Sequence, residues 1–240
     1  MRFGRPHRHY RRCDSTNSQA RELAAAGAPS GLVVTAEQQT AGRGRQGRAW
    51  VAPAGKALLY SALLRPLEER HLLLPLAVPL AVCEAAERLG GGPCRVKWPN
   101  DVLIDDRKCA GILIEARPRD GWAVIGVGLN LSIEPHEFPP ELRATATSVG
   151  GADPGAALAA LNQRLGAWVE APEEEVLAEF RRRDALRGRE ISWQNRSGTA
   201  EGIDDKGNLL VRTADGEAIS LGAGEVHLRL DPPSQSGCPA

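Results

Sequence analysis

The sequence has no excess of either charge, few cysteines and no long hydrophobic run. Thirty basic residues balance thirty acidic ones, which argues against a general nucleic-acid coat, because such a protein needs surplus Lys and Arg to neutralise phosphates. The five cysteines include no C-x-x-C pair. We therefore expect neither a disulfide framework nor a cysteine zinc site, but small buried thiols in a reducing compartment.

A membrane-spanning pattern is also missing. The longest apolar run, at residues 72–83, is about 12 residues long and contains two prolines, which is too short to cross a bilayer. The N-terminus is basic, but no apolar stretch follows it, so it does not have the pattern of a signal peptide. We expect a cytoplasmic protein.

The chain is long enough, at 240 residues, for a principal domain and a small one. Residues 14–17 are all helix-capping types, so a helix should begin after them. Periodicity predicts helices at 19–26, 72–89, 156–169 and 173–186, and strands at 32–36, 57–64, 95–98, 102–104, 110–115 and 122–131. This mixture indicates an α+β domain over residues 1–187, with a mixed, largely antiparallel sheet.

The composition changes after Gly188, where short strand patterns alternate with turn signals. The predicted strands lie at 190–194, 198–203, 209–213, 217–221 and 225–230. Five short strands at this spacing predict a small C-terminal β-barrel domain at 188–231. Residues 232–240 are rich in Pro, Ser and Gly, which predicts a disordered tail.

The most informative segment for function is residues 42–50, with the sequence GRGRQGRAW. Its three glycines allow the backbone to lie closely against a ligand, and its three arginines offer planar donors for phosphate or carboxylate. Trp50 adds an aromatic face on which a base can stack. A solvated basic loop or an RNA-binding Arg-Gly segment is the alternative. The Walker A and Rossmann spacings are not met.

A second segment, residues 97–101 with the sequence KWPND, is followed by Lys108 and Gly111. Asn100 and Asp101 leave a predicted strand together and offer hard oxygen ligands that suit magnesium. Lys108 lies on the returning arm of a predicted hairpin, so it should come close to Asp101. The alternative is an ordinary Asp–Lys surface pair, which contributes little.

These segments together resemble the biotin–protein ligases. The resemblance rests on six segments in the family's order: 14–17, 37–39, 42–50, 97–101, 108–115 and 126–130. It covers roughly residues 10–150, and the barrel-like C-terminal region matches the family's small C-terminal domain. It implies a catalytic domain like that of class II aminoacyl-tRNA synthetases, followed by an SH3-like barrel.

The resemblance also implies roles for individual residues. Lys108, Arg45 and Asp101 would be catalytic, and Asn100 and Asp101 would hold Mg²⁺. The expected biotin-binding residues are Ser15, Thr16, Asn17, Gln39, Gly42, Arg43, Arg45, Lys108 and Gly111. The expected ATP- or adenylate-binding residues are Arg43, Arg45, Arg48, Trp50, Asn100, Lys108 and Asn130.

The implied reaction has two steps, with biotin and ATP as substrates and Mg²⁺ as cofactor. Biotinyl-5′-AMP forms first, and biotin then passes to a lysine of a biotin carboxyl carrier protein. Loop 42–50 should be mobile without ligand and become ordered over the adenylate. In contrast to the family pattern, Gln46 occupies a position where arginine is common.

Two rival functions remain: a lipoate–protein ligase, and an adenylate- or nucleic-acid-binding regulator. The arginine-rich loop and Gln39 favour biotin over lipoate. Only 13 residues precede Asp14, so we expect no winged-helix DNA-binding domain and no sequence-specific DNA binding. Whether the protein forms a homodimer is left open.

Overall fold

The computed structural model describes residues 1–223 and 228–230. It divides into two compact units, the first spanning Met1–Ala185 and the second beginning at Leu186. The predicted boundary lies between residues 187 and 188. The tail predicted to be disordered, at 232–240, lies outside the described residues.

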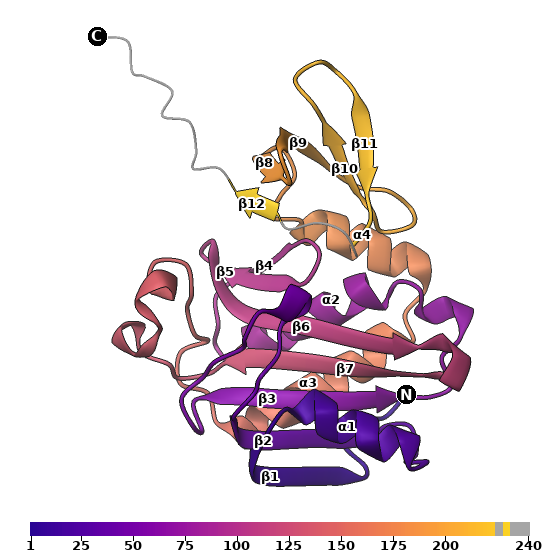
Figure 1. Cartoon of the computed structure of the whole chain (residues 1–240), viewed down its shortest axis with the longest axis vertical. Coiled ribbons are helices and arrows are strands. Elements are labelled where there is room, and N and C mark those ends of the chain that lie inside the picture. The colour runs from indigo at the N-terminus through magenta and orange to yellow at the C-terminus, as the bar shows by residue number, and fades with distance from the viewer. Residues whose placement is uncertain (224–227, 231–240) are drawn as a thin grey trace. The chain divides into compact units, whose positions relative to one another are not determined.

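The first unit is built on a seven-stranded sheet with the order β1-β2-β3-β7-β6-β5-β4 (Figure 1). Its strands are β1 (His7–Cys13), β2 (Val33–Gln39), β3 (Ala57–Leu64), β4 (Cys94–Lys97), β5 (Asp101–Ile104), β6 (Arg107–Arg117) and β7 (Trp122–Asn130). The β1–β2 pair is parallel, and the other neighbouring pairs are antiparallel. The predicted α+β class with a largely antiparallel sheet is therefore confirmed.

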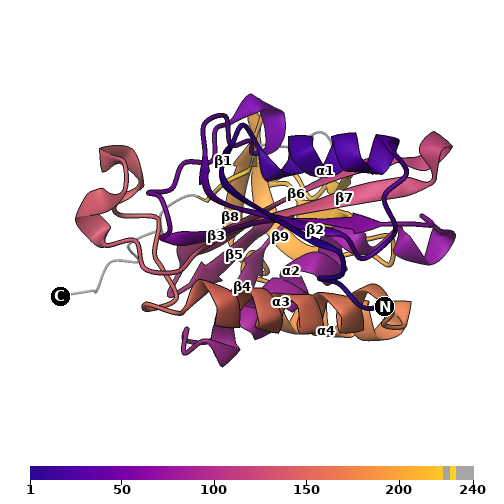
Figure 2. The same cartoon turned by 90° about the horizontal axis from the view of Figure 1, so that it is seen from below.

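Four helices cover this sheet. They are α1 (Thr16–Ala25), α2 (Leu74–Arg88), α3 (Pro154–Val169) and α4 (Glu173–Arg183). Figure 2 shows α1 on one face of the sheet and the other three helices on the opposite face. The central strands β3 and β7 are consequently buried along their whole length, which explains why they are near-continuous apolar runs rather than alternating patterns.

Two expectations about the N-terminal region differ from the structure. The first helix begins at Thr16, three residues before the predicted start at 19. Its N-cap residue, Ser15, makes no side-chain capping bond, and the side chains of Thr16 and Asn17 bond to other strands instead. The strand β1 was not predicted at all, because it is an exposed, basic edge strand without an apolar alternation.

The second unit is an antiparallel sheet with the strand order β11-β10-β9-β8-β12. Its strands are β8 (Glu190–Trp193), β9 (Arg196–Ile203), β10 (Leu209–Arg212), β11 (Ala218–Leu221) and β12 (Leu228–Leu230). All five coincide with predicted strands. The last was expected to start at residue 225, but residues 224–227 are not among those described.

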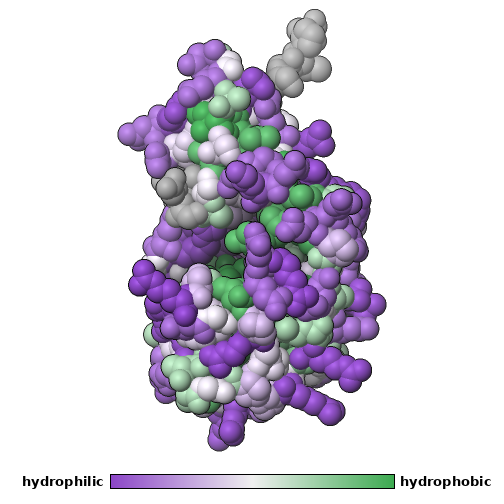
Figure 3. Space-filling model, turned by 90° about the vertical axis from the view of Figure 1, so that its right-hand side faces the viewer, coloured by the Kyte–Doolittle hydropathy of each residue, from purple (hydrophilic) through white to green (hydrophobic). Residues whose placement is uncertain are grey.

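Hydrophilic side chains dominate the surface seen in Figure 3, with apolar residues exposed only in patches. Among the residues described, the large hydrophobic side chains that are exposed are Met1, Val51, Leu72 and Leu142. Within 1–223 and 228–230, no helix is both long enough and apolar enough to span a membrane.

Candidate active site

The first unit contains a cavity of about 210 Å³ beside the N-terminal end of α1. It gathers residues from α1, the end of β2, the glycine-rich loop, and strands β6 and β7. The predicted site residues that line it are Ser15, Thr16, Asn17, Gln39, Arg43, Arg45, Arg48, Trp50, Asn100, Lys108, Gly111 and Asn130. Segments that lie up to about 115 residues apart in the sequence thus form a single wall.

Two predicted residues, Asp101 and Gly42, do not line the cavity but contact residues that do. Asp101 Oδ1 lies 2.6 Å from Lys108 Nζ, as expected for a hairpin that returns the lysine to the aspartate. Gly42 packs against Gln39 and Trp50, and a Cβ built on it would lie 2.3 Å from the Trp50 carbonyl oxygen. The close approach of these backbones therefore requires a glycine at position 42.

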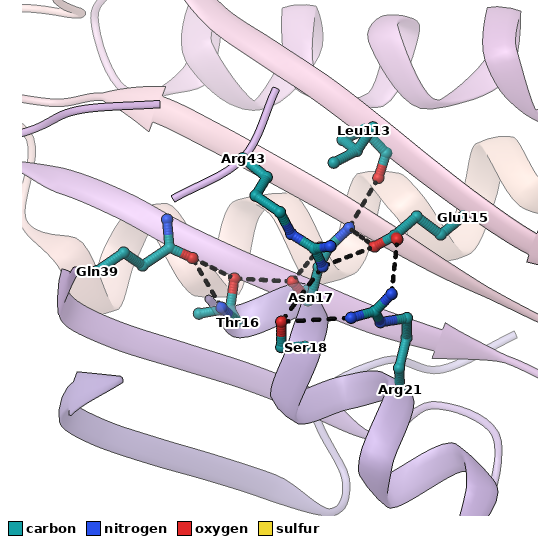
Figure 4. A network of polar contacts seen from close by, with 9 residues as sticks. Thr16, Asn17, Ser18, Arg21, Gln39, Arg43, Leu113 and Glu115 are labelled. Atoms are coloured by element: carbon teal, nitrogen blue, oxygen red, sulfur yellow. Dashed lines mark hydrogen bonds and ion pairs between the residues drawn. The ribbon is translucent and has the colours of Figure 1, made fainter. Parts of the chain in front are cut away.

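One end of the cavity is polar. The Thr16 backbone N–H donates to Gln39 Oε1 at 2.7 Å, and Thr16 Oγ1 lies 3.1 Å from the same oxygen (Figure 4). Ser15, Thr16 and Asn17 are all buried, although none is apolar. Buried polar groups that are already bonded to each other offer a preorganised surface for a polar ligand.

A carboxylate on β6 connects this polar end to the glycine-rich loop. Glu115 accepts a 2.8 Å hydrogen bond from Asn17 and forms ion pairs with Arg21 at 3.2 Å and Arg43 at 3.5 Å (Figure 4). Ser18 also accepts from both arginines. The Arg43 guanidinium therefore points toward Glu115, which makes it an anchor of the loop as well as a lining residue.

The glycine-rich loop forms a compact hairpin. Gly44 N–H donates to the Arg48 carbonyl at 2.7 Å, and Trp50 N–H donates to the Gly42 carbonyl at 3.0 Å. Gln46, at the position where arginine is common in the family pattern, lies at the tip with φ of 54°. This left-handed conformation is unusual for a non-glycine residue. The predicted mobility of the loop in solution stays a prediction.

The loop also places positive charge over the cavity. Burial lowers the pKa of Arg45 from its usual value; Asp101 opposes this shift and Arg48 adds to it. Both arginines nevertheless keep their charge, because a guanidinium does not deprotonate in proteins. Two cations held close together in a partly desolvated site are stabilised by an anionic ligand, so this end of the cavity is suited to phosphate.

Trp50 lies flat on the sheet over two glycines. A Cβ on Gly128 would come within 2.3 Å of Trp50 Cε2, and one on Gly111 would come within 2.9 Å of Cζ3. The ammonium of Lys108 lies 5.6 Å from the centre of the indole ring. Within the described part of the chain, Trp50 Nε1 has no hydrogen-bond partner. The two glycines thus create the space in which the indole sits.

The amides of Asn100 and Asn130 hold the backbone of neighbouring segments. Asn100 Nδ2 donates to the Ile112 carbonyl at 3.1 Å, and Asn130 Nδ2 donates to the Thr147 carbonyl at 2.9 Å. The second contact fixes a segment that the sequence did not assign to the site. This segment and its surroundings contribute Phe138, Leu142, Thr145 and Ala146 to the cavity wall.

Other lining residues were also missed by sequence reasoning. They include Leu59, Tyr60, Ile112, Leu113, Gly126, Val127 and Gly128. The two glycines had a detectable signal, since a glycine inside a strand pattern indicates close approach of another group. The apolar residues had no such individual signal, because a core residue and a ligand-lining residue have the same sequence pattern, although Ile112, Leu113 and Val127 lie in segments that carried the family resemblance.

Comparisons with known proteins agree with this geometry. Residues 10–131 match the Biotin/lipoate A/B protein ligase family, and residues 188–229 match the Biotin protein ligase C terminal domain. A biotin protein ligase from Aquifex aeolicus, solved in complex with biotin and ATP, superimposes with a TM-score of 0.82 at 28% sequence identity. The match covers 94% of this chain and 99% of that one.

Curated relatives give the same result. The Mycobacterium tuberculosis protein named Biotin--[acetyl-CoA-carboxylase] ligase is 36% identical over 235 residues, which cover 90% of this chain and 86% of that protein. The chain belongs to the Biotin/lipoate A/B protein ligase family, and within it to the biotin protein ligases.

Not every relative is matched over its full length. The Bacillus subtilis Bifunctional ligase/repressor BirA is 40% identical over 144 residues, which cover 58% of this chain. The match spans 44% of that relative, so the chain covers under half of its length.

Proposed function

We propose that the protein is an ATP-dependent ligase that forms biotinyl-5′-AMP and transfers biotin to a lysine of a biotin carboxyl carrier protein. The observation that carries the proposal is the single cavity that joins a neutral polar end, at Thr16 and Gln39, to a cationic end, at Arg45 and Lys108. A biotin carboxylate and an ATP phosphate have to meet between two such ends.

In the first step, a carboxylate oxygen of biotin attacks the α-phosphorus of ATP, and the bond to pyrophosphate breaks. Two anions have to approach each other, so charge neutralisation is the main requirement. We assign this role to Lys108, Arg45 and Arg48, all of which line the cavity. Asp101 holds the Lys108 ammonium in place through their 2.6 Å ion pair.

In the second step, the ε-amine of a carrier lysine attacks the acyl carbon, and AMP leaves. The amine must lose a proton, and Asp101 is a carboxylate close to Lys108 that suits this role. The hairpin formed by residues 42–50 shields the adenylate from water, because it covers the same cavity. We assign the contacts with the adenosine part to Trp50 and Asn130, which line the same cavity.

Mg²⁺, bound together with the triphosphate, would supply further positive charge at the reacting phosphate. No group of three His, Cys, Asp or Glu that could hold a metal occurs among residues 1–223 and 228–230. Asp101 is paired with Lys108, and the Asn100 amide donates to the Ile112 carbonyl. Asn100 and Asp101 offer side-chain oxygens that would hold Mg²⁺ beside the phosphates; by themselves they do not form a complete metal site.

The proposal is tested by incubating the protein with Mg²⁺, ATP and either biotin or lipoate, and by identifying the adenylate by mass. Biotinyl-5′-AMP is the expected product. Lipoyl-AMP alone would make the protein a lipoate–protein ligase, and binding without turnover of either acid would make it an adenylate-binding regulator. The carrier and a cytoplasmic location stay predictions, as does the expectation that specific DNA sites are not bound, and a homodimer is left open.

A further inference from the structure

A buried serine stands behind the polar end of the cavity. Ser61, on β3, is fully buried, and its Oγ lies 2.6 Å from Asn17 Oδ1 and 2.8 Å from Thr16 Oγ1. Because water cannot reach the Ser61 hydroxyl, its single proton is donated to one of these two neighbours. The chemistry of the neighbouring groups determines which one receives it.

The chain of contacts begins at the Asn17 amide. Asn17 Nδ2 lies 2.8 Å from Glu115 Oε2 and 3.3 Å from the Leu113 carbonyl oxygen. Both partners only accept hydrogen bonds, so the amide NH₂ must face them and Oδ1 must face Ser61. Since Oδ1 only accepts, the single proton of the Ser61 hydroxyl is donated to Asn17.

This arrangement determines which of Ser61 and Thr16 donates the hydrogen bond between them. Ser61 has no second proton, so its 2.8 Å contact with Thr16 requires that Thr16 Oγ1 donates. The other polar neighbour, Gln39 Oε1, is more distant at 3.1 Å and already accepts the Thr16 backbone N–H at 2.7 Å. The Thr16 proton is therefore directed to Ser61, and Thr16 Oγ1 presents lone pairs to a ligand.

Gln39 supplies the complementary group. Its Oε1 accepts from the Thr16 backbone N–H at 2.7 Å, and Figure 4 shows the side-chain nitrogen of Gln39 pointing away from Thr16. The cavity thus offers an acceptor on Thr16 next to a donor on Gln39. A ligand that matches both has an N–H directly beside a C=O, as in a cyclic urea.

A glycine on the neighbouring strand makes this chain of hydrogen bonds geometrically feasible. Gly126, on β7, is paired with Ser61 across the sheet. A Cβ built on Gly126 would lie 2.2 Å from Asn17 Oδ1, so any other residue would push the Asn17 amide away from Ser61. The glycine and the serine therefore act as one unit beneath Asn17.

We propose that Ser61, which does not itself line the cavity, is a specificity-determining positioning residue. By accepting the proton of Thr16, it keeps Thr16 Oγ1 as an acceptor for the N–H of a cyclic urea. This inference rests on the proposed function, and it names the residue that orients Thr16 toward the ring of the acid substrate.

The experiment compares biotin with its two mono-N-methyl ureido analogues, which lack one N–H each. Affinities are measured by calorimetry, and adenylate formation by mass, for the wild type, Ser61→Ala and Ser61→Cys. The added methyl group has the same steric cost in each protein, so the change in preference isolates the hydrogen bond. For one analogue, the preference for biotin should fall about tenfold in both variants.

Three controls separate positioning from general damage. The KM for ATP should stay within twofold of the wild-type value, which a disordered pocket would not allow. Ser30→Ala removes a hydroxyl that bonds to Arg65 N, outside the cavity, and should keep the full preference. Gly126→Ala should lose the preference as Ser61→Ala does, because it displaces Asn17. Ser61→Cys preserves the volume if the alanine variant does not fold.

The outcomes are distinct. An unchanged preference in folded Ser61→Ala and Ser61→Cys would overturn the inference, whether or not the enzyme makes biotinyl-AMP. A wild-type protein that binds biotin with an N–H-dependent preference but forms no adenylate would refute the proposed function alone. Loss of the preference in both serine variants, with Ser30→Ala unaffected, would support the role of Ser61.

Discussion

Lys108 is the residue on which the chemical step depends most. Replacing it with alanine removes a cation from the cavity and leaves the Asp101 carboxylate without its 2.6 Å partner, so the site has less positive charge to offset the phosphates. We expect Lys108→Ala to slow adenylate formation by about 10²–10³-fold, measured as pyrophosphate release in a single turnover. The double variant Lys108→Ala, Asp101→Asn should recover part of the rate. A wild-type rate in Lys108→Ala would exclude the assigned role.

Gly128 is predicted to matter because of the ring that lies on it. A Cβ at this position would stand 2.3 Å from Trp50 Cε2, so Gly128→Ala must displace the indole. The KM for ATP should therefore rise by about tenfold or more, as expected for a lost ring contact with adenine, while biotin affinity changes little. Gly92→Ala is the matched control, because its nearest neighbour beyond the adjacent residues is at 3.6 Å. Equal effects of the two substitutions would contradict this account of the glycine.

The sequence predicted most of the polar and charged residues that line the cavity, but few of its apolar residues and little of what orients the polar ones. Residues 42–50 and 97–101 are local motifs, so residues that are adjacent in the sequence are enough to indicate their chemistry. The contact between Ser61 and Asn17 spans 44 residues, and that between Asn17 and Glu115 spans 98. Such pairs depend on strand register, which a single sequence does not specify.

At the scale of elements, the glycine-rich loop at residues 42–50 should determine whether the reactive adenylate is kept in the site until the correct protein acceptor arrives. Arg45→Ala removes a cation from a hairpin that also carries Arg48. The loop should then bind the adenylate phosphate more weakly, and reactive adenylate should escape from the site. We expect biotin incorporation into an unrelated protein to rise several-fold, with Arg88→Ala as a control outside the loop.

Amide exchange across residues 42–50 tests the dynamic part of the same account. Exchange should be fast without ligand and slow with biotin and ATP, because ordering costs about 1–2 kcal/mol per residue in backbone entropy that the ligand contacts must offset. Equally slow exchange in both states would mean that the hairpin is preformed.

The elements themselves were predictable to different degrees. The two central strands are recognisable in the sequence as apolar runs, and the helices on the face opposite α1 show apolar periodicity. In both cases burial determines the composition. The edge strand β1 is exposed and basic, so only its pairing with β2 makes it a strand. The first turn of α1 was misread for a related reason. Its polar residues serve the cavity rather than the helix end.

At the scale of the whole molecule, ligand binding should raise the temperature at which the protein unfolds. A ligand at 100 times its Kd adds about 2.7 kcal/mol to the free energy of unfolding, which corresponds to a shift on the order of 5–10 °C for a chain of this size. Biotin should produce such a shift by calorimetry, whereas lipoate at the same concentration should not. A lipoate shift without a biotin shift would reverse the substrate assignment.

Transfer to a carrier tests the central claim most directly. The protein is incubated with biotin, Mg²⁺, ATP and an isolated biotin carboxyl carrier domain, and the intact mass of the carrier is recorded. The account predicts a carrier heavier by one biotinyl group, attached to a single lysine, only when ATP is present, and a much slower appearance of this product with Lys108→Ala. A carrier whose mass is unchanged while the same sample consumes ATP and holds biotin would contradict it.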